Sequence, residues 1–439
     1  MVRHPVWHLS RGALKFDGGA ADSSVMLKKI AVERLAPGMY VHDLGVAWSD
    51  HPFTFNRFKL KSEDQVAEMM AAGLQAVYID TAKGDDVHDA PTAADVRAEV
   101  DARMLDVAIS TETPAHLPVS EEIVNARMLH QRAHAVVAEL MQDGRLGRAV
   151  QIENVAALVD DITQSVVRNS GALLAMLRLK NKDDYTFMHC VSVGTLMVTF
   201  GRSLGLQGDA LRQAGIGGFV HDVGKTLIPD AVLNKPGPLT AREYLLIKRH
   251  PADGHEILLR SSNVGPEALD IALHHHERLD GKGYPEKCPP ERISRLARMA
   301  AIVDVYDAIT SDRPYHAGLA PTEALRKMLE WCNGHFDEPL LRRFIRCVGI
   351  YPTGTLVRLN NGWLAVVLEQ NTTDLLKPAV RAVYCSQTRT AMEPLDIDLA
   401  QSQNYRIVAD ESPEQWAIDP MHFLDGTHGA TAGQQDIAA

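Results

Sequence analysis

The sequence is poor in cysteine and has no long apolar run. Its five cysteines are scattered through 439 residues and form no CxxC pair, which argues against a disulfide framework or a thiolate zinc site and favours a reducing compartment. The first residues lack the apolar core of a secretory signal, and no uncharged stretch reaches the roughly 20 apolar residues of a membrane span. We therefore expect a cytoplasmic protein without a membrane span.

Positive charge is also scarce. Lysine and arginine total 45 against 56 aspartates and glutamates, and the net charge is −11. Such an acidic chain is not typical of a protein that binds a nucleic acid polymer, so an anionic substrate must meet a local positive site of metal ions or a few cations. No glycine-rich phosphate loop follows a strand, and we attribute Gly215, Gly217 and Gly218 to close helix packing. Histidine is frequent, with 19 residues.

The order of patterns along the chain predicts a mainly α protein, in which a long helical domain is flanked by a small N-terminal α+β domain and a small C-terminal β appendage. We expect a tail over 1–25, the α+β domain over 26–84, a linker over 85–118, the helical domain over 119–350, the β appendage over 351–424 and a tail over 425–439. The linker is expected to be a solvated tether with at most one helix, over Ala93–Ala108.

Local signals support this division. Apolar residues at helical spacing predict helices over 123–141, 155–179, 186–204, 209–223, 240–249, 267–276, 296–310 and 322–331. The segments Ser62–Gln65 and Thr240–Glu243 have the capping-box pattern of a helix start. The turn Asn360-Asn361-Gly362 between two β-type runs predicts a hairpin in the C-terminal appendage.

Residues that can hold metal ions recur on successive predicted helices. They are His189, the adjacent pair His221 and Asp222, His250, the run His274–His276, and Asp304 within an apolar helix. A buried carboxylate without a partner is costly, so Asp304 needs a cation. Imidazole and carboxylate are ligands for Zn, Fe, Mn or Co, and a carboxylate can bridge two ions. Each residue alone has an ordinary structural explanation, but the whole set indicates a metal centre.

These residues belong to motifs that resemble those of the HD-GYP subgroup of HD-domain metal phosphohydrolases. The motifs are HDVGK over 221–225, HHERLDGKGYP over 275–285, DVYDA over 304–308 and RPY over 313–315. The resemblance covers about residues 126–350. Residues 28–84 resemble the uncharacterised domain that often precedes HD-GYP domains in bacterial proteins.

The resemblance implies a helical HD-type domain that hydrolyses cyclic di-GMP to linear pGpG, and often on to GMP, with two iron or manganese ions. It implies the metal ligands His189, His221, Asp222 as a bridge, His250, His275, His276 and Asp304. Asp222 and Lys225 are the expected catalytic residues, and His274 is assigned a structural role. The expected substrate-binding residues are Lys225, Arg278, Asp280, Gly281, Gly283, Tyr284, Pro285 and Arg313.

The chemistry of these residues suits such a reaction. Two ions that share a water lower its pKa and supply a hydroxide for in-line attack on phosphorus, while Lys225 stabilises charge on the phosphoryl oxygens. The glycines allow close approach of the backbone to a nucleotide, and Tyr284 offers a stacking face. Arg278 and Arg313 are forks suited to phosphate or guanine.

The chain departs from the family pattern at a few positions. Tyr185 stands where some members carry a glutamate ligand, so we expect two metal ions rather than three. Leu279 and His316 replace a frequent tryptophan and a basic residue, which leaves hydrolysis of another cyclic dinucleotide open. A catalytically silent protein that binds cyclic di-GMP or acts as an adaptor also remains an alternative, as do a homodimer and a signalling protein partner.

Overall fold

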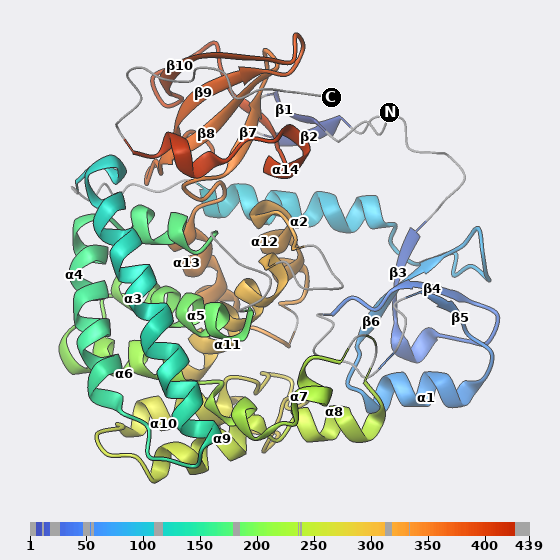
Figure 1. Ribbon diagram of the computed structural model, residues 1–439. Helices are drawn as coiled ribbons and strands as arrows, with labels where there is room; N and C mark the ends of the chain where they lie inside the picture. The colour runs from blue at the N-terminus through green and yellow to red at the C-terminus, as the bar shows by residue number, and fades with distance from the viewer. Residues whose placement is uncertain are drawn as a thin grey trace, which may run out of the picture.

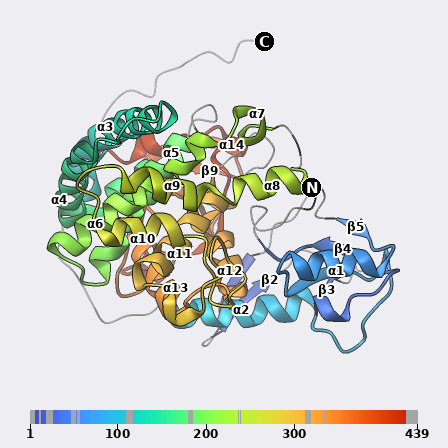
Figure 2. The same cartoon turned by 90° about the horizontal axis from the view of Figure 1, so that it is seen from below.

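The computed structural model describes residues 6–10, 13–17, 27–46, 53, 57–108, 117–178, 185–235, 237, 239–311, 318–332 and 334–425. A small α+β unit lies beside a helical domain, and a C-terminal sheet lies at another edge of that domain (Figure 1). The view from below shows the α+β unit clearly offset from the helices (Figure 2). The predicted mainly α fold with two small flanking units is confirmed.

The N-terminal unit is a four-stranded sheet covered by one helix. Its strands are β3 (Leu27–Ala31), β4 (Tyr40–Asp43), β5 (Phe58–Lys59) and β6 (Ala76–Asp80), in the order β3-β6-β4-β5, and the helix is α1 (Glu63–Ala71). Ser62 occupies the N-cap position of α1 without a side-chain capping bond; instead the Lys61 amide donates to Gln65 Oε1 at 2.7 Å. Within the predicted tail, β1 (Val6–Ser10) and β2 (Ala13–Asp17) form an antiparallel pair.

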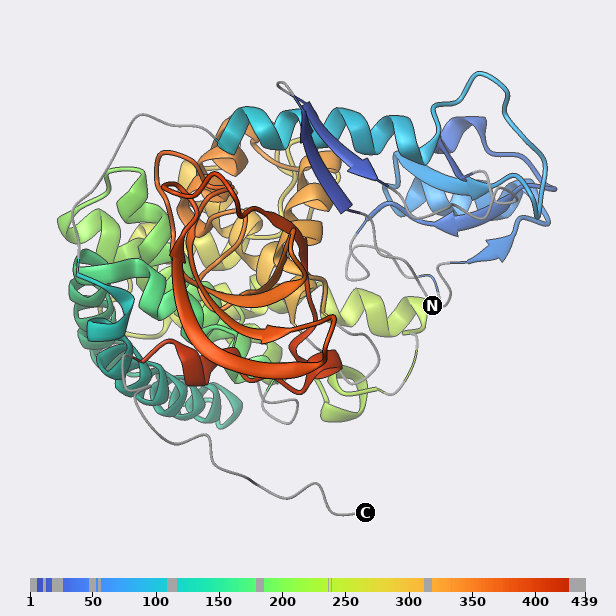
Figure 3. The same ribbon diagram turned by 90° about the horizontal axis from the view of Figure 1, so that it is seen from above.

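The helix α2 (Ala93–Ala108) has the predicted bounds but is not a solvated tether. Val100, Met104 and Val107 are buried in the main hydrophobic core, and Asp101 Oδ1 accepts from Arg326 Nε at 2.8 Å. The view from above shows α2 running along the helical domain from the N-terminal unit (Figure 3). The expectation of a tether was wrong because the acidic residues share the helix with an apolar stripe that needs burial.

The helical domain contains the eight predicted helices and others that were missed. Its helices are α3 (Val119–Arg145), α4 (Ile152–Met176), α5 (Tyr185–Ser203), α6 (Gly208–Val220), α7 (Asp230–Leu233), α8 (Ala241–Ile247), α9 (His250–Leu259), α10 (Pro266–His274), α11 (Arg295–Thr310), α12 (Pro321–Glu330) and α13 (Glu338–Val348), with 3-10 turns η4 (Val223–Leu227) and η5 (Pro290–Arg292). The capping box at Thr240 is present. The start of α9, His-Pro-Ala-Asp-Gly, looks like a loop in sequence, although proline is tolerated in a first helical turn.

Glycines let α5 and α6 approach closely. A Cβ atom on Gly218 would lie 2.9 Å from the Cα of Gly194, and one on Gly215 would lie 2.7 Å from side chains of Val159 and Val198. Distances below 3.0 Å leave no room for a side chain. The predicted role of the α6 glycines in helix packing is confirmed, and this packing brings the ends of the two helices together.

The C-terminal unit is a five-stranded antiparallel sheet in the order β10-β9-β8-β7-β11 (Figure 3). Its strands are β7 (Leu356–Leu359), β8 (Trp363–Glu369), β9 (Ala379–Cys385), β10 (Thr390–Asp398) and β11 (Ile407–Asp410), followed by α14 (Pro413–Trp416) and η6 (Pro420–Phe423). The predicted hairpin joins β7 to β8, with Gly362 at φ +85° in its turn. No helix of the described residues combines the length and apolar character needed to cross a bilayer.

Candidate metal centre

The predicted ligand side chains meet where several helices end. Helix α6 stops at Val220, so that His221 and Asp222 project beyond its end. His250 opens α9, and His275 and His276 follow the last residue of α10. The other two, His189 and Asp304, lie on α5 and α11. All seven predicted ligands lie in this cluster.

Asp222 is at the centre of the cluster and is fully buried. Its Oδ2 atom lies 3.4 Å from His221 Nε2 and 3.5 Å from His189 Nε2. Its Oδ1 atom faces the opposite group, at 3.2 Å from His250 Nε2 and 3.8 Å from His275 Nε2. The two oxygens of one carboxylate thus serve two different sets of imidazoles, as a bridge between two cations requires.

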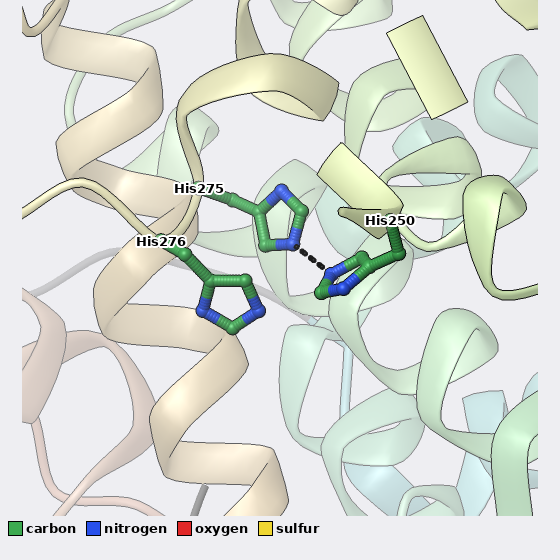
Figure 4. Close-up of side chains that lie close together, drawn as sticks. All are labelled: His250, His275 and His276. Carbon is green, nitrogen blue, oxygen red and sulfur yellow. Dashed lines mark hydrogen bonds between the residues drawn. The ribbon is translucent and has the colours of Figure 1, made fainter. Parts of the chain in front are cut away.

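Each set can surround an ion of its own. His189, His221 and Asp304 have ligand atoms within 4.8 Å of one another, and Asp304 Oδ1 lies 2.9 Å from His189 Nε2. The second set is His250, His275 and His276, whose ligand atoms also lie within 4.8 Å of one another. Figure 4 shows the rings of this second set turned toward one another, with the Nε2 atoms of His250 and His275 3.2 Å apart.

Hydrogen bonds on the far side of the rings orient the imidazoles. His221 Nδ1 lies 2.8 Å from the Gly218 carbonyl oxygen, and His250 Nδ1 lies 2.7 Å from that of Ile247. His275 Nδ1 is likewise 3.0 Å from the Ala272 carbonyl oxygen. A carbonyl oxygen only accepts, so each Nδ1 carries the proton and each Nε2 presents a lone pair to the centre.

His189 is oriented by a carboxylate instead of a backbone carbonyl. Its Nδ1 lies 2.8 Å from Asp307 Oδ2, and Asp307 is only 2% exposed. Burial lowers the pKa of His189, but the hydrogen bonds to Asp304 and Asp307 outweigh burial and raise it to about 8. The carboxylates around this ring therefore attract positive charge, which a proton or a metal ion can supply.

The other groups are held in the charge states that suit metal ligands. Burial lowers the pKa of His275 well below its usual value and that of His276 to about 3, so both rings are neutral. Burial opposes ionisation of Asp222, but Lys225 and His221 hold its pKa well below the usual range. The pKa of Asp304 is also low, because its hydrogen bond with His189 outweighs its burial. Metal ions bind neutral imidazole and ionised carboxylate.

Two buried atoms at the centre lack a hydrogen-bond partner, and this tests whether metal ions fit. They are His221 Nε2 and Asp222 Oδ1, and both face other lone-pair donors. Unsatisfied buried polar atoms are rare in folded proteins. The donor set of imidazole and carboxylate groups, with opposed Nε2 atoms and unsatisfied lone pairs, fits divalent cations.

Lys225 stands beside the bridging carboxylate. It lies on η4, one turn after Asp222, and its Nζ atom is 2.5 Å from Asp222 Oδ2. A Cβ atom on the intervening Gly224 would lie 2.0 Å from the His250 carbonyl oxygen, so only glycine lets η4 pass the start of α9. The Lys225 side chain is 21% exposed and can reach a ligand bound at the centre.

The Gly-Tyr-Pro loop lies directly beside the centre. The Tyr284 ring stacks on His276 with centroids 4.6 Å apart and an interplanar angle of 26°, and Lys248 Nζ lies 4.9 Å from the Tyr284 centroid. Gly281 has φ +69°, and a Cβ atom on Gly283 would lie 2.5 Å from the Arg278 amide nitrogen. The Tyr284 face that the sequence analysis assigns to nucleotide stacking is thus in contact with His276, a predicted metal ligand.

Arg278 and Asp280 are paired with each other. Arg278 donates from Nε and Nη2 to the two Asp280 oxygens at 3.2 and 2.7 Å. Asp280 also accepts from the Lys282 amide at 3.0 Å and from Gln75 Nε2 at 2.7 Å. This ion pair uses two of the five N–H donors of the Arg278 guanidinium, so the predicted phosphate or guanine contact falls to the remaining donors.

The cavity beside the loop is small. It is lined by Tyr244, Lys248, His276, Tyr284 and other residues and has a volume of about 20 Å³, which accommodates one water molecule. Pro285 follows Tyr284 in the same loop, whereas the predicted substrate residue Arg313 and the variant position His316 lie outside the described residues.

Sequence reasoning gave no role to Asp307, Lys248 or Gln75. The position of Asp307, one turn after Asp304 in the same apolar helix, was a signal, because a second buried acid also needs a partner. Lys248 precedes His250 at a helix end, where a lysine is ordinary. Gln75 lies in the N-terminal unit, and nothing in its local sequence connects it to residue 280.

Comparison with known proteins gives the same assignment as the motifs. Residues 27–155 match a domain of unknown function (DUF3391), and residues 166–340 match the HD domain. A protein of Pseudomonas aeruginosa that is named a cyclic di-GMP phosphodiesterase is 44% identical over 394 residues, which cover 89% of this chain and 94% of that protein. This chain belongs to the HD-GYP subgroup of the HD-domain family.

Other relatives match a smaller part of the chain. The cyclic di-GMP phosphodiesterase response regulator RpfG of Xanthomonas campestris is 48% identical over 145 residues, which are 33% of this chain and 38% of that protein. The 3'3'-cGAMP-specific phosphodiesterase 1 of Vibrio cholerae is 36% identical over 179 residues, which are 40% of this chain and 41% of that protein. Like other HD-domain proteins, this HD-GYP protein depends on divalent metal ions, and its histidine and aspartate clusters fit them.

Proposed function

We propose that this HD-GYP protein is a phosphodiesterase that hydrolyses cyclic di-GMP to linear pGpG. The observation that carries the proposal is the Asp222 carboxylate, whose two oxygens face separate sets of imidazoles 3.2–3.5 Å away. A relative named for this activity is 44% identical to this chain, and the match covers 89% of this chain and 94% of that protein. The proposal includes the site residues predicted from the motifs, with His189, His221, Asp222, His250, His275, His276 and Asp304 as ligands.

Two divalent ions, iron or manganese, bind at this centre in the proposed enzyme. His189, His221 and Asp304 would hold the first ion, His250, His275 and His276 would hold the second, and Asp222 would be shared by both. The bound ions supply Lewis acidity and a deprotonated water at neutral pH. Imidazole and carboxylate donors without sulfur suit these two metals.

The side chains of the protein then perform positioning and charge stabilisation. Lys225, 2.5 Å from the bridging carboxylate, can turn its ammonium group toward a phosphoryl oxygen as negative charge develops there. Tyr284 and the glycines beside it set one wall of the site against His276. The buried centre excludes bulk water from the reacting phosphate, which strengthens these charge interactions.

The five cysteines are free thiols, which suits a reducing compartment. We therefore place the enzyme in the cytoplasm.

Its substrate carries two phosphodiester charges, and the chain has a net charge of −11. The metal centre and Lys225 are therefore the main attraction for such an anion.

The test is turnover by the full-length protein loaded anaerobically with Fe²⁺ or Mn²⁺. Cyclic di-GMP should be converted to pGpG, and Asp222→Asn should bind less metal and show no turnover. Asp209→Asn, an exposed acid in the first turn of α6 at the far end of this helix from Asp222, is the control and should keep turnover. Equal activity in wild type and Asp222→Asn would refute the proposed centre.

A second candidate substrate follows from the comparisons, because relatives named as 3'3'-cGAMP-specific phosphodiesterases also match part of this chain. Competition between cyclic di-GMP and 3'3'-cGAMP in one reaction decides between the two. Preferred consumption of cyclic di-GMP supports the proposal. Stoichiometric binding of either nucleotide without any product from metal-loaded protein would identify a silent binding protein instead.

A further inference from the structure

A second group of metal-binding side chains lies behind the Gly-Tyr-Pro loop. His274, the last residue of α10, was assigned only a structural role from sequence. Its ligand atom, together with those of Glu286 and Cys288, forms a set within 4.8 Å of one another. Glu286 follows Pro285 directly and Cys288 lies two residues further on, so the group connects the end of α10 to the end of the loop.

The distances suit a tetrahedral ion. His274 Nε2 lies 3.7 Å from Glu286 Oε2, and Cys288 Sγ lies 3.6 Å from the same oxygen. The bond lengths of zinc to nitrogen, oxygen and sulfur place neighbouring ligands of a tetrahedral site about 3.4–3.6 Å apart. Both distances from Glu286 Oε2 lie close to these values, and the His274 and Cys288 ligand atoms lie within 4.8 Å of each other.

His274 is prepared as a ligand in the same way as the histidines of the catalytic centre. Its Nδ1 lies 2.7 Å from Asp270 Oδ1, and Asp270 is in turn held by the Ser294 hydroxyl. The carboxylate fixes the tautomer with the proton on Nδ1 and directs the Nε2 lone pair toward Glu286 and Cys288. His274 Nε2 is buried and has no hydrogen-bond partner. Carboxylate–histidine–metal triads have this arrangement.

The loop is also built to present its two ligands. The amides of Glu286 and Cys288 donate to the two oxygens of Glu277 at 2.7 and 3.0 Å, and Glu277 is only 3% exposed. Cys288 is 1% exposed and packs in a small apolar cluster with Ile293 and Ala297. Glu286 is 43% exposed in its side chain, which leaves an open side for a water as the fourth ligand.

Arg292 is the competing partner. Its Nη2 atom lies 3.0 Å from Glu286 Oε2, but its side chain is 64% exposed. Arg292 holds the same oxygen, Oε2, that faces His274 Nε2 and Cys288 Sγ. An ion bound at this oxygen therefore displaces the exposed Arg292 side chain or moves it to the other carboxylate oxygen, Oε1. The absence of CxxC spacing excludes a site of several thiolates, and it does not exclude one thiolate joined by a histidine and a glutamate.

We propose that His274, Glu286 and Cys288 bind a zinc ion that fastens the Gly-Tyr-Pro loop to α10. Sulfur and nitrogen donors select zinc over manganese, so this site and the catalytic centre hold different metals. His275, the next residue after His274, belongs to the catalytic set, and Tyr284 stacks on His276. The ion therefore fixes the loop against the catalytic centre without being part of it.

The thiolate provides a test that does not depend on turnover. Protein stripped of metal and titrated with Co²⁺ should show sulfur-to-cobalt charge-transfer absorption in the near ultraviolet. The predicted catalytic ligands contain no sulfur and give no such band. Cys288→Ser should remove the band and one equivalent of bound Co²⁺, whereas Cys385→Ser, a cysteine of β9 in the C-terminal sheet, should keep both.

Glu286→Gln provides an independent check on a partly exposed residue whose replacement leaves the apolar cluster in place. It should raise the Co²⁺ concentration at half-saturation of the band at least tenfold, and Glu291→Gln, an exposed glutamate nearby, should leave it unchanged. A wild-type protein without the band at saturating Co²⁺, or a band that persists in Cys288→Ser, overturns the proposal. Neither outcome affects the proposed phosphodiesterase, which is tested through Asp222.

Discussion

Asp307 offers a sharp test of how the centre is organised, because it contacts the first metal-binding set through His189. Its Oδ2 atom is 2.8 Å from His189 Nδ1 and 3.3 Å from Ser311 Oγ. On its other side, the His189 ring presents Nε2 to Asp304 at 2.9 Å. Asp307→Ala should free this ring to rotate and leave its Nδ1 proton without an acceptor.

The expected magnitude follows from carboxylates that orient metal-bound histidines. Loss of such a partner lowers metal affinity about 10- to 100-fold, which corresponds to about 1.4–2.7 kcal/mol. Only the set His189, His221 and Asp304 should be affected, because His250 and His275 are oriented by backbone carbonyls. Asp307→Asn keeps an acceptor oxygen and should fall between wild type and Asp307→Ala.

The assay is metal titration of chelator-stripped protein, followed by the metal content after dialysis against a weak chelator. Asp307→Ala should retain the ion of the second set and lose that of the first. Glu122→Gln is the control, since it removes a carboxylate that is as buried as that of Asp307 but lies on α3, far from Asp307 in the sequence. Unchanged affinity for two ions in Asp307→Ala would refute the reasoning about His189.

Three further outcomes are expected. Asp222→Asn should lower turnover at least ~100-fold because both ligand sets lose their shared charge, as rate and metal content will show. Gln75→Ala removes the 2.7 Å bond from the N-terminal unit to Asp280 and should raise KM for cyclic di-GMP several-fold with bound metal unchanged. Glu122→Gln should destabilise the fold by about 1–3 kcal/mol. Burial raises the pKa of Glu122, but Arg168 and neighbouring donors outweigh it, so the folded-state pKa is low. Glu122 in the wild type therefore stabilises the fold above its unfolded-state pKa of about 4.3, and this contribution is lost as the pH falls through the lower folded-state pKa. Denaturation of the wild type and Glu122→Gln at several pH values will show the loss.

The N-terminal unit is closely joined to the catalytic domain. Glu330 on α12 accepts from Lys29 at 2.8 Å and from the Tyr78 hydroxyl at 2.7 Å, while Gln75 reaches Asp280 in the Gly-Tyr-Pro loop. These hydrogen bonds connect the N-terminal unit both to α12 and to the loop. Insensitivity of KM to Gln75→Ala would separate the two parts functionally.

Local sequence predicted the elements better than it predicted their surroundings. The bounds of α2 were predicted correctly, yet its burial was missed. The composition of this segment is acidic overall, but a few apolar residues on one side of the helix determine which face packs against the core. Helix α9 was missed since its first turn contains proline and glycine. The hairpin at Asn360–Gly362 was correct because its signal is confined to the turn residues themselves.

The sequence by itself determined which residue types could form the centre, their motifs and the helices that carry them, because these depend on spacing along the chain. Only the tertiary structure decided that Asp222 faces two sets of imidazoles, that Asp307 orients His189, and that Arg278 is paired with Asp280. Only the fold could bring Gln75 to Asp280, or His274 to Cys288 across the loop. Such contacts depend on the angles at which helices end and loops close, and packing over the whole domain sets those angles.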